Sequence, residues 1–190
     1  FAGGRHRRDG RHRQGLPVTA RMQTLPAIAA IGAALLVLSA GTASAQSVTL
    51  IGTFKDWAAY SASEGAGAVC FAMSKPSDVS PSPDGYTQAY LYLTHRPSEN
   101  VSNELNLVAG FEFAPDQPAS LAVGGKSFDL FTQKDAAWLL DPSQNDSLAG
   151  ALRSGSSVVV QGTSARGILI SETFSLSGAT AASRAIDSGC

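Results

Sequence analysis

The stretch Leu105-Asn106-Leu107-Val108-Ala109-Gly110-Phe111-Glu112-Phe113 is the clearest indication of fold class in this chain. An apolar residue recurs at every second position from 105 to 113. A repeat of two residues is typical of a β-strand, because successive side chains of a strand point to opposite faces. We therefore expect a strand with one buried face at 105–113.

Other segments show the same preference for strands. Val, Ile, Thr, Phe and Tyr, which suit pleated and half-buried surfaces, gather in short runs. These runs are 48–53, 57–61, 68–73, 86–94, 121–123, 127–131, 158–161 and 168–176. Gly124-Gly125 separates two of them, and a polar turn containing Gly162 and Gly167 separates two others, so both places predict hairpins. Segment 74–85 carries prolines among serines and aspartates, which predicts an exposed loop.

Two segments interrupt the strands with apolar residues at helical spacing, 146–153 and 180–186. Gly155 is placed to end the first of these helices. We therefore expect a mainly β fold, either an antiparallel β-sandwich or a partly closed barrel, with two short helices.

Residues 22–45 have the features of a secretory signal peptide. An apolar run is followed by Ala43-Ser44-Ala45, the small-x-small pattern that precedes signal cleavage. We expect cleavage between Ala45 and Gln46, which leaves 46–190 as a single β-rich domain outside the cytoplasm. The apolar run is short for a bilayer span of about 20 residues. We therefore expect no stable membrane span after cleavage.

Residues 1–21 begin with Phe1 and are rich in arginine. We interpret them as an upstream, non-native extension that precedes a start at Met22. Two alternatives stay open, a long basic region of the signal and an arm that contacts nucleic acid.

The charge and the cysteine content of the domain at 46–190 limit the partners and the compartment that it can have. It has eight Lys and Arg residues against fourteen Asp and Glu residues, a net charge of −6. An acidic domain with scattered basic residues is a poor partner for nucleic acid. Cys70 and Cys190 are its two cysteines, and in an oxidising compartment they predict one disulfide bond. The alternative is a pair of free thiols.

Six short motifs occur in order along this domain and resemble the invasion-associated locus B family of bacterial envelope proteins. They are Gly52-Thr53-Phe54-Lys55-Asp56-Trp57, Cys70-Phe71-Ala72-Met73-Ser74-Lys75-Pro76, Leu93-Thr94-His95-Arg96-Pro97, Phe128-Asp129-Leu130-Phe131-Thr132, Gly162-Thr163-Ser164-Ala165-Arg166-Gly167 and Thr173-Phe174-Ser175-Leu176-Ser177-Gly178. The resemblance implies a protein of the bacterial periplasm or cell envelope, or a secreted one. It also implies a link to host-cell invasion without an assigned biochemical activity.

Catalytic and metal-binding patterns are weak. His95 is the only histidine in 46–190, and no G-x-S-x-G nucleophile motif occurs. We expect His95 to be a partly exposed, hydrogen-bonded residue at a strand end; the alternative is a secreted hydrolase that uses it as a base. Zinc needs three or four N or S ligands, which one histidine and a disulfide do not supply. Gly124-Gly125-Lys126-Ser127 lies between strands and lacks the earlier glycine of a phosphate loop. We therefore predict no catalytic residue, cofactor or metal.

Binding is the function class that remains. The aromatic residues considered for it are Trp57, Trp138, Tyr86, Tyr90 and Tyr92. Packing in the core and on sheet faces is favoured for them over an exposed platform for a glycan or partner. Arg96 and Arg166 lie inside the family-like motifs and are expected to brace loops. Candidate binding or loop-bracing residues are thus Trp57, His95, Arg96 and Arg166, and the expected partner is an unidentified envelope or host protein or a glycan.

Overall fold

The computed structural model describes residues 47–64 and 67–190. The predicted extension at 1–21, the signal peptide at 22–45 and the cleavage point between Ala45 and Gln46 lie outside these residues.

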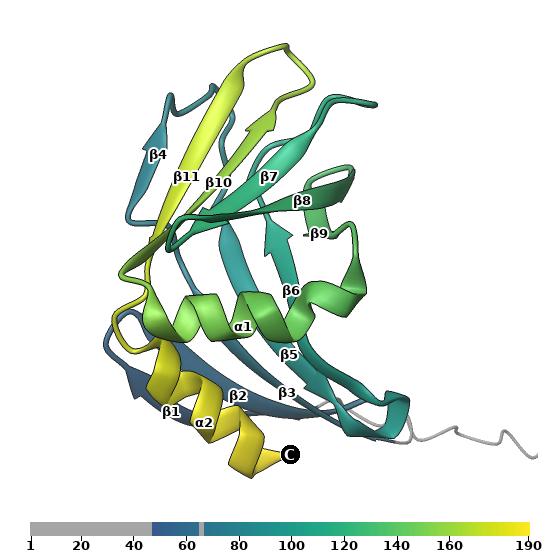
Figure 1. Ribbon diagram of the computed structural model, residues 1–190, viewed down its shortest axis with the longest axis vertical. Helices are drawn as coiled ribbons and strands as arrows, with labels where there is room; N and C mark the ends of the chain where they lie inside the picture. The colour runs from purple at the N-terminus through teal and green to yellow at the C-terminus, as the bar shows by residue number, and fades with distance from the viewer. Residues whose placement is uncertain (1–46, 65–66) are drawn as a thin grey trace, which may run out of the picture. The chain divides into compact units, whose positions relative to one another are not determined.

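The described chain forms one antiparallel sheet of eleven strands in the order β1-β2-β3-β5-β6-β9-β8-β7-β10-β11-β4, which bends strongly along its length (Figure 1). The strands are β1 (Val48–Phe54), β2 (Trp57–Glu64), β3 (Gly67–Ser74), β4 (Asp78–Ser80), β5 (Tyr90–Arg96), β6 (Val101–Val108), β7 (Ala119–Val123), β8 (Lys126–Gln133), β9 (Ala136–Leu139), β10 (Ser157–Thr163) and β11 (Leu169–Ser175). The sheet does not close between β1 and β4, its two edges. The prediction of a mainly β sandwich or partly closed barrel with two short helices is confirmed.

Strand β6 begins earlier and ends earlier than the alternating pattern at 105–113 predicts. Gly110 turns the chain with a φ of +71°, and its carbonyl accepts a hydrogen bond from the Thr87 N–H. Beyond this turn Phe113 makes an isolated bridge with Ser164 instead of continuing the strand. The alternation still marks burial, because Leu105, Leu107 and Phe113 are all in the core.

The loop prediction for 74–85 is wrong at Asp78–Ser80, which form β4. This short strand pairs with β11 at the far edge of the sheet, although it follows β3 closely in sequence. The Ser77 N–H donates to the Thr173 carbonyl at 2.7 Å and begins this pairing. The prediction failed because the partner strand lies about 95 residues away, and such pairing leaves no local signal.

Both predicted hairpins form. Gly124 and Gly125 have φ values of +57° and +78°, the conformation that a two-residue hairpin turn between β7 and β8 requires. The second hairpin joins β10 to β11, with Gly167 in its turn and Gly162 inside β10.

Helices α1 (Asn145–Ser154) and α2 (Ala179–Gly189) lie against the same face of the sheet (Figure 1). Their buried residues, among them Leu148, Leu152, Ala182 and Ile186, pack with the inward residues of the strands in one core. We call the face of the sheet that they cover its inner face and the opposite one its outer face. Neither helix of the described segment has the length and apolar character needed to cross a bilayer.

Candidate functional site

A disulfide bond fixes the end of α2 to β3, the third strand from one edge of the sheet. Cys70 lies on the inner side of β3 and is fully buried, and its bond partner is Cys190 after the end of α2. Their Cα atoms are 5.8 Å apart, within the range of about 4.4–6.8 Å usual for disulfides. The predicted pairing is therefore present in the structure. The bond links segments that are 120 residues apart in sequence, and it holds α2 against the strands β1, β2, β3 and β5 that it contacts.

His95 lies beside this disulfide, since His95 and Cys70 are directly paired between β5 and β3. The expectation that the histidine is partly exposed is wrong: it is only 7% exposed, because α2 covers this end of β5. Its Nδ1 accepts a hydrogen bond from the Asn103 N–H at 3.3 Å. Its Nε2 lies 3.0 Å from Oδ1 of Asp187 on α2, an electrostatic contact without regular hydrogen-bond geometry.

These contacts leave His95 poorly arranged for proton transfer. A ring nitrogen that accepts from a backbone N–H carries no proton, so the neutral ring has its proton on Nε2, facing Asp187. Within the described part of the chain, no serine hydroxyl makes a hydrogen bond with this ring. The same described residues contain no group of three His, Cys, Asp or Glu side chains that could hold a metal ion.

Trp57 and Arg96 brace the fold. Trp57 is 2% exposed, and its indole N–H donates to the Ser175 carbonyl of β11 at 2.8 Å. This bond ties the start of β2 to a strand near the opposite edge of the sheet. The Arg96 guanidinium bonds the carboxylates of Glu104 at 2.7 Å and Glu99 at 3.0 Å, and so fixes the turn between β5 and β6.

Arg166 lies apart from the other three candidates. It is exposed in the turn between β10 and β11 and borders a hollow of about 210 Å³ with Tyr86, Phe111 and Glu112. The structure therefore brings Trp57, His95 and Arg96 to one half of the sheet and leaves Arg166 in the other, so the four predicted residues do not form one site.

A group of aromatic side chains lies on the outer face. We call it the outer aromatic face, and it consists of Tyr60, Phe71, Tyr90, Tyr92, Trp138 and Phe131. Cross-strand pairing places Phe71 beside Tyr60 and sets Trp138 beside Phe131. Ring centroids of neighbours are 5.2 Å apart for Tyr60 and Phe71 and 6.0 Å apart for Phe71 and Tyr92.

The positions of these aromatic residues agree with the interpretation that they pack in the core and on sheet faces. Trp57 belongs to the core, and Tyr90, Tyr92 and Trp138 lie half-buried on the uncovered face of the sheet. Tyr60, Phe71 and Phe131 were not singled out from the sequence. The alternation of inward and outward positions within each strand could have identified these three residues. In the same way it places Tyr90 and Tyr92 on either side of the buried Leu91.

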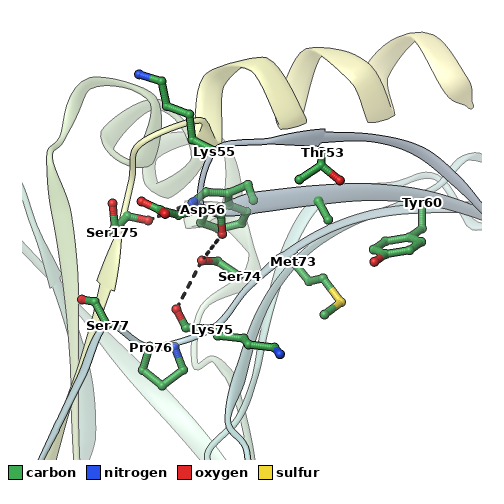
Figure 2. A pocket seen from close by; sticks show the side chains of 12 residues that line it. Thr53, Lys55, Asp56, Tyr60, Met73, Ser74, Lys75, Pro76, Ser77 and Ser175 are labelled. Atoms are coloured by element: carbon green, nitrogen blue, oxygen red, sulfur yellow. Dashed lines mark hydrogen bonds between the residues drawn. The ribbon is translucent and has the colours of Figure 1, made fainter.

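Two hollows adjoin the outer aromatic face. The larger, of about 450 Å³, lies where β2 and β3 meet the chain leading to β4. Figure 2 shows Tyr60 and Met73 in it, on the side of the sheet opposite to α2, while the Ser74 hydroxyl donates to the Asp56 carbonyl below the turn. The second hollow, of about 340 Å³, is lined by Val69, Phe71, Tyr92, Thr94, Arg96, Glu104, Asn106 and Val108.

One buried carboxyl group lies in the other half of the sheet. Glu172 on β11 is 1% exposed, and one of its oxygens accepts a hydrogen bond from the Tyr86 hydroxyl at 3.0 Å. Its second oxygen is buried without a hydrogen-bond partner in the described structure. Burial raises the pKa of Glu172 from 4.5 to about 8, against the lowering effect of the Tyr86 bond. This raised pKa favours the protonated form of Glu172 at neutral pH.

Comparison of the sequence with known protein families gives a match over most of the domain. Residues 57–187 match the sequence model of the family described as invasion associated locus B (IalB) protein, which is well over half of the chain. The chain belongs to the IalB family. The matched region runs from Trp57 at the start of β2 to Asp187 near the end of α2, so the contact between His95 and Asp187 lies inside the family region.

A solved structure is similar to this IalB chain. The crystal structure of invasion associated protein b from Bartonella henselae has a TM-score of 0.51 at 17% identity. The similarity covers 73% of this chain and 96% of that chain. At this level of identity the similarity establishes a shared fold. None of the curated proteins matches the chain.

Proposed function

We propose that this IalB-family protein is an exported, non-catalytic binding protein of the bacterial envelope, with host-cell interaction as its setting. Cleavage between Ala45 and Gln46 would release the domain at 46–190. The disulfide between Cys70 and Cys190 supports a location outside the cytoplasm, because such bonds persist in oxidising compartments. The family description, which names invasion, supports the setting.

The environment of His95 is the observation that carries the non-catalytic part of the proposal. A general base needs a free nitrogen within hydrogen-bond reach of the proton that it removes. Here Nδ1 is bonded to the Asn103 N–H, and Nε2 faces Asp187. The arrangement contains two members of a Ser-His-Asp triad but uses both ring nitrogens within the protein. Its role is to hold α2 against β5.

Two experiments test the proposal together. The purified mature protein is screened with ester, glycoside and peptide substrates, and we expect no turnover that His95→Ala removes. The same protein, immobilised, is exposed to periplasmic extract and to host-cell surface material, and we expect saturable capture of a component. Turnover that disappears in a folded His95→Ala variant would contradict the proposal and favour a hydrolase.

A further inference from the structure

We propose that the outer aromatic face binds a chain of neutral sugar units, with one pyranose ring seated in the hollow between Phe71 and Tyr92. This inference rests on the proposed binding function and names the ligand class for it.

The position of the face leaves it available to a ligand. The residue pairs of β3, β5 and β6 place Met73, Tyr92 and Asn106 in one row, and Trp138 of β9 continues it. Both helices pack on the inner face, so no helix of the described chain covers this row. Phe131 at the end of the row is 52% exposed. The other members of the row are half-buried, so the row is a partly exposed surface that is largely apolar, and surfaces of this kind often belong to interaction sites.

The shape of the second hollow fits a small cyclic ligand. Its volume of about 340 Å³ falls in the lower part of the range of roughly 300–1,000 Å³ found for small-molecule sites. The rings of Phe71 and Tyr92 are inclined at 60° to each other, so they form two walls rather than a flat surface. Val69 and Val108 complete an apolar lining, against which the C–H face of a pyranose can pack.

The polar groups of this hollow suit hydroxyls. Arg96 supplies N–H donors, the Glu104 carboxylate supplies acceptors, and Asn106 supplies an amide. Arg96 and Glu104 are bonded to each other at 2.7 Å, so their charges compensate. A ligand with both donors and acceptors at its edge, and without net charge, matches this arrangement. A polyanion does not match it, because the domain has a net charge of −6.

The spacing of the rings favours a chain over a single sugar. Successive centroids from Tyr60 through Phe71 to Tyr92 are 5.2 Å and 6.0 Å apart, comparable with the length of one pyranose unit. A linear oligosaccharide crossing the strands, with one unit seated between Phe71 and Tyr92, would therefore bring the neighbouring unit against Tyr60. Aromatic side chains with a polar tip, such as Tyr, serve this kind of contact well.

Titration of the mature protein with β-1,4-linked hexasaccharides of glucose and of N-acetylglucosamine tests the inference. Calorimetry measures affinity, and amide chemical shifts locate the site. We expect weak, saturable binding to at least one of them, with amide shifts confined to the strands that carry the outer aromatic face, β2, β3, β5, β6, β9 and β8. Phe71→Ser and Glu104→Gln should each weaken binding by about tenfold or more, because each removes one wall or one acceptor of the hollow.

Leu169→Ser is the matched control, since Leu169 is 59% exposed on β11 away from the outer aromatic face. It should leave affinity unchanged. Phe131→Ala, at a side chain that is already exposed, provides a variant that keeps its fold if Phe71→Ser unfolds.

Several results would overturn the inference. The first two are a lack of binding to both hexasaccharides and amide chemical shifts that change outside the outer aromatic face. The other two are adsorption of the outer aromatic face to lipid vesicles and self-association of the protein that Phe131→Ala abolishes. Capture of a partner that is unaffected by Phe71→Ser and Glu104→Gln would leave the proposed function standing and refute only the glycan site.

Discussion

His95 on β5 and Asp187 on α2 approach to 3.0 Å beside the disulfide that ends the chain. The C-terminal helix is therefore attached to the sheet twice, by a covalent bond and by an electrostatic contact one strand away. This double attachment buries the only histidine of the domain and turns both of its ring nitrogens toward groups of the protein.

The disulfide should supply a large part of the stability. The double variant Cys70→Ala with Cys190→Ala is expected to lose about 2–5 kcal/mol of unfolding free energy, because its unfolded state is no longer constrained by a loop of 120 residues. Urea unfolding with and without reductant measures this loss. The variant itself should show no response to reductant. Free thiols at both positions in wild-type protein from the periplasm would contradict the bond.

His95 should matter for stability and not for turnover. We expect His95→Ala to cost about 1–3 kcal/mol, because it leaves the Asn103 N–H without its acceptor and opens a gap under α2. Asp187→Asn, at an exposed side chain, should cost less. Chemical unfolding of both single variants and the double variant measures the coupling between the two side chains. Unchanged stability in His95→Ala would show that these contacts are not maintained in solution.

Glu172 should make the protein less stable as pH rises. In the folded state its pKa is about 8 against 4.5 for an ordinary glutamate, so between these values the folded protein holds a proton that the unfolded chain has released. Unfolding free energy therefore falls with increasing pH across this window, by up to a few kcal/mol at about 1.4 kcal/mol per pKa unit.

Glu172→Gln tests this dependence, because a neutral amide removes the titration and keeps the shape. We expect urea midpoints of this variant to vary less between pH 4.5 and pH 8 than those of wild type. Glu112→Gln, at an exposed carboxylate, is the control and should follow wild type. Parallel pH profiles for wild type and Glu172→Gln would refute the assignment.

Gly178 should be intolerant of any side chain. It precedes α2 with a φ of +96°, and a Cβ there would collide with the backbone carbonyl of Phe54. Gly167 has a φ of +78° but open space around it, which makes it the matched control. In both alanine variants the positive φ should lower the free energy of unfolding by about 1–2 kcal/mol. The collision in Gly178→Ala should lower it by at least about 1 kcal/mol more. Equal thermal shifts in the two variants would contradict the close approach.

Export should be visible in the mass of the product. Protein recovered from the periplasm or medium is expected to begin at Gln46, because Ala43-Ser44-Ala45 supplies the cleavage pattern. Intact-mass measurement distinguishes this product from one that keeps the segment at 22–45. A variant with Ala45→Arg should accumulate uncleaved, whereas Ser44→Thr should be processed normally.

Local patterns predicted the parts of the fold that depend on local chemistry. The alternation around β6, the strand-forming runs of β3 and β5, the Gly124-Gly125 turn and the two helices were all predicted from the sequence. Strand β9 was missed because its four residues, two of them alanine, form a run too short to be recognised as a strand. Strand β4 was missed because its pairing is entirely non-local.

The candidate site was less predictable for a related reason. Each strand shows which of its residues share a face, but the order of strands in the sheet decides which faces become neighbours. Tyr92 and Trp138 are 46 positions apart in the chain, and only the intervening β6 residue Asn106 brings them into one row. The burial of His95 likewise depends on where α2 docks, which no nearby residue specifies.

The placement of β4 has a consequence for the order in which the chain can fold. Strands β3 and β4 are nearly consecutive in sequence but lie eight places apart in the sheet, so β4 has no partner until β11 exists. Assembly cannot proceed by adding one hairpin after another along the chain. Until β11 forms, β4 stays unpaired, and the pairing of two strands so far apart in sequence is of the kind that slows folding.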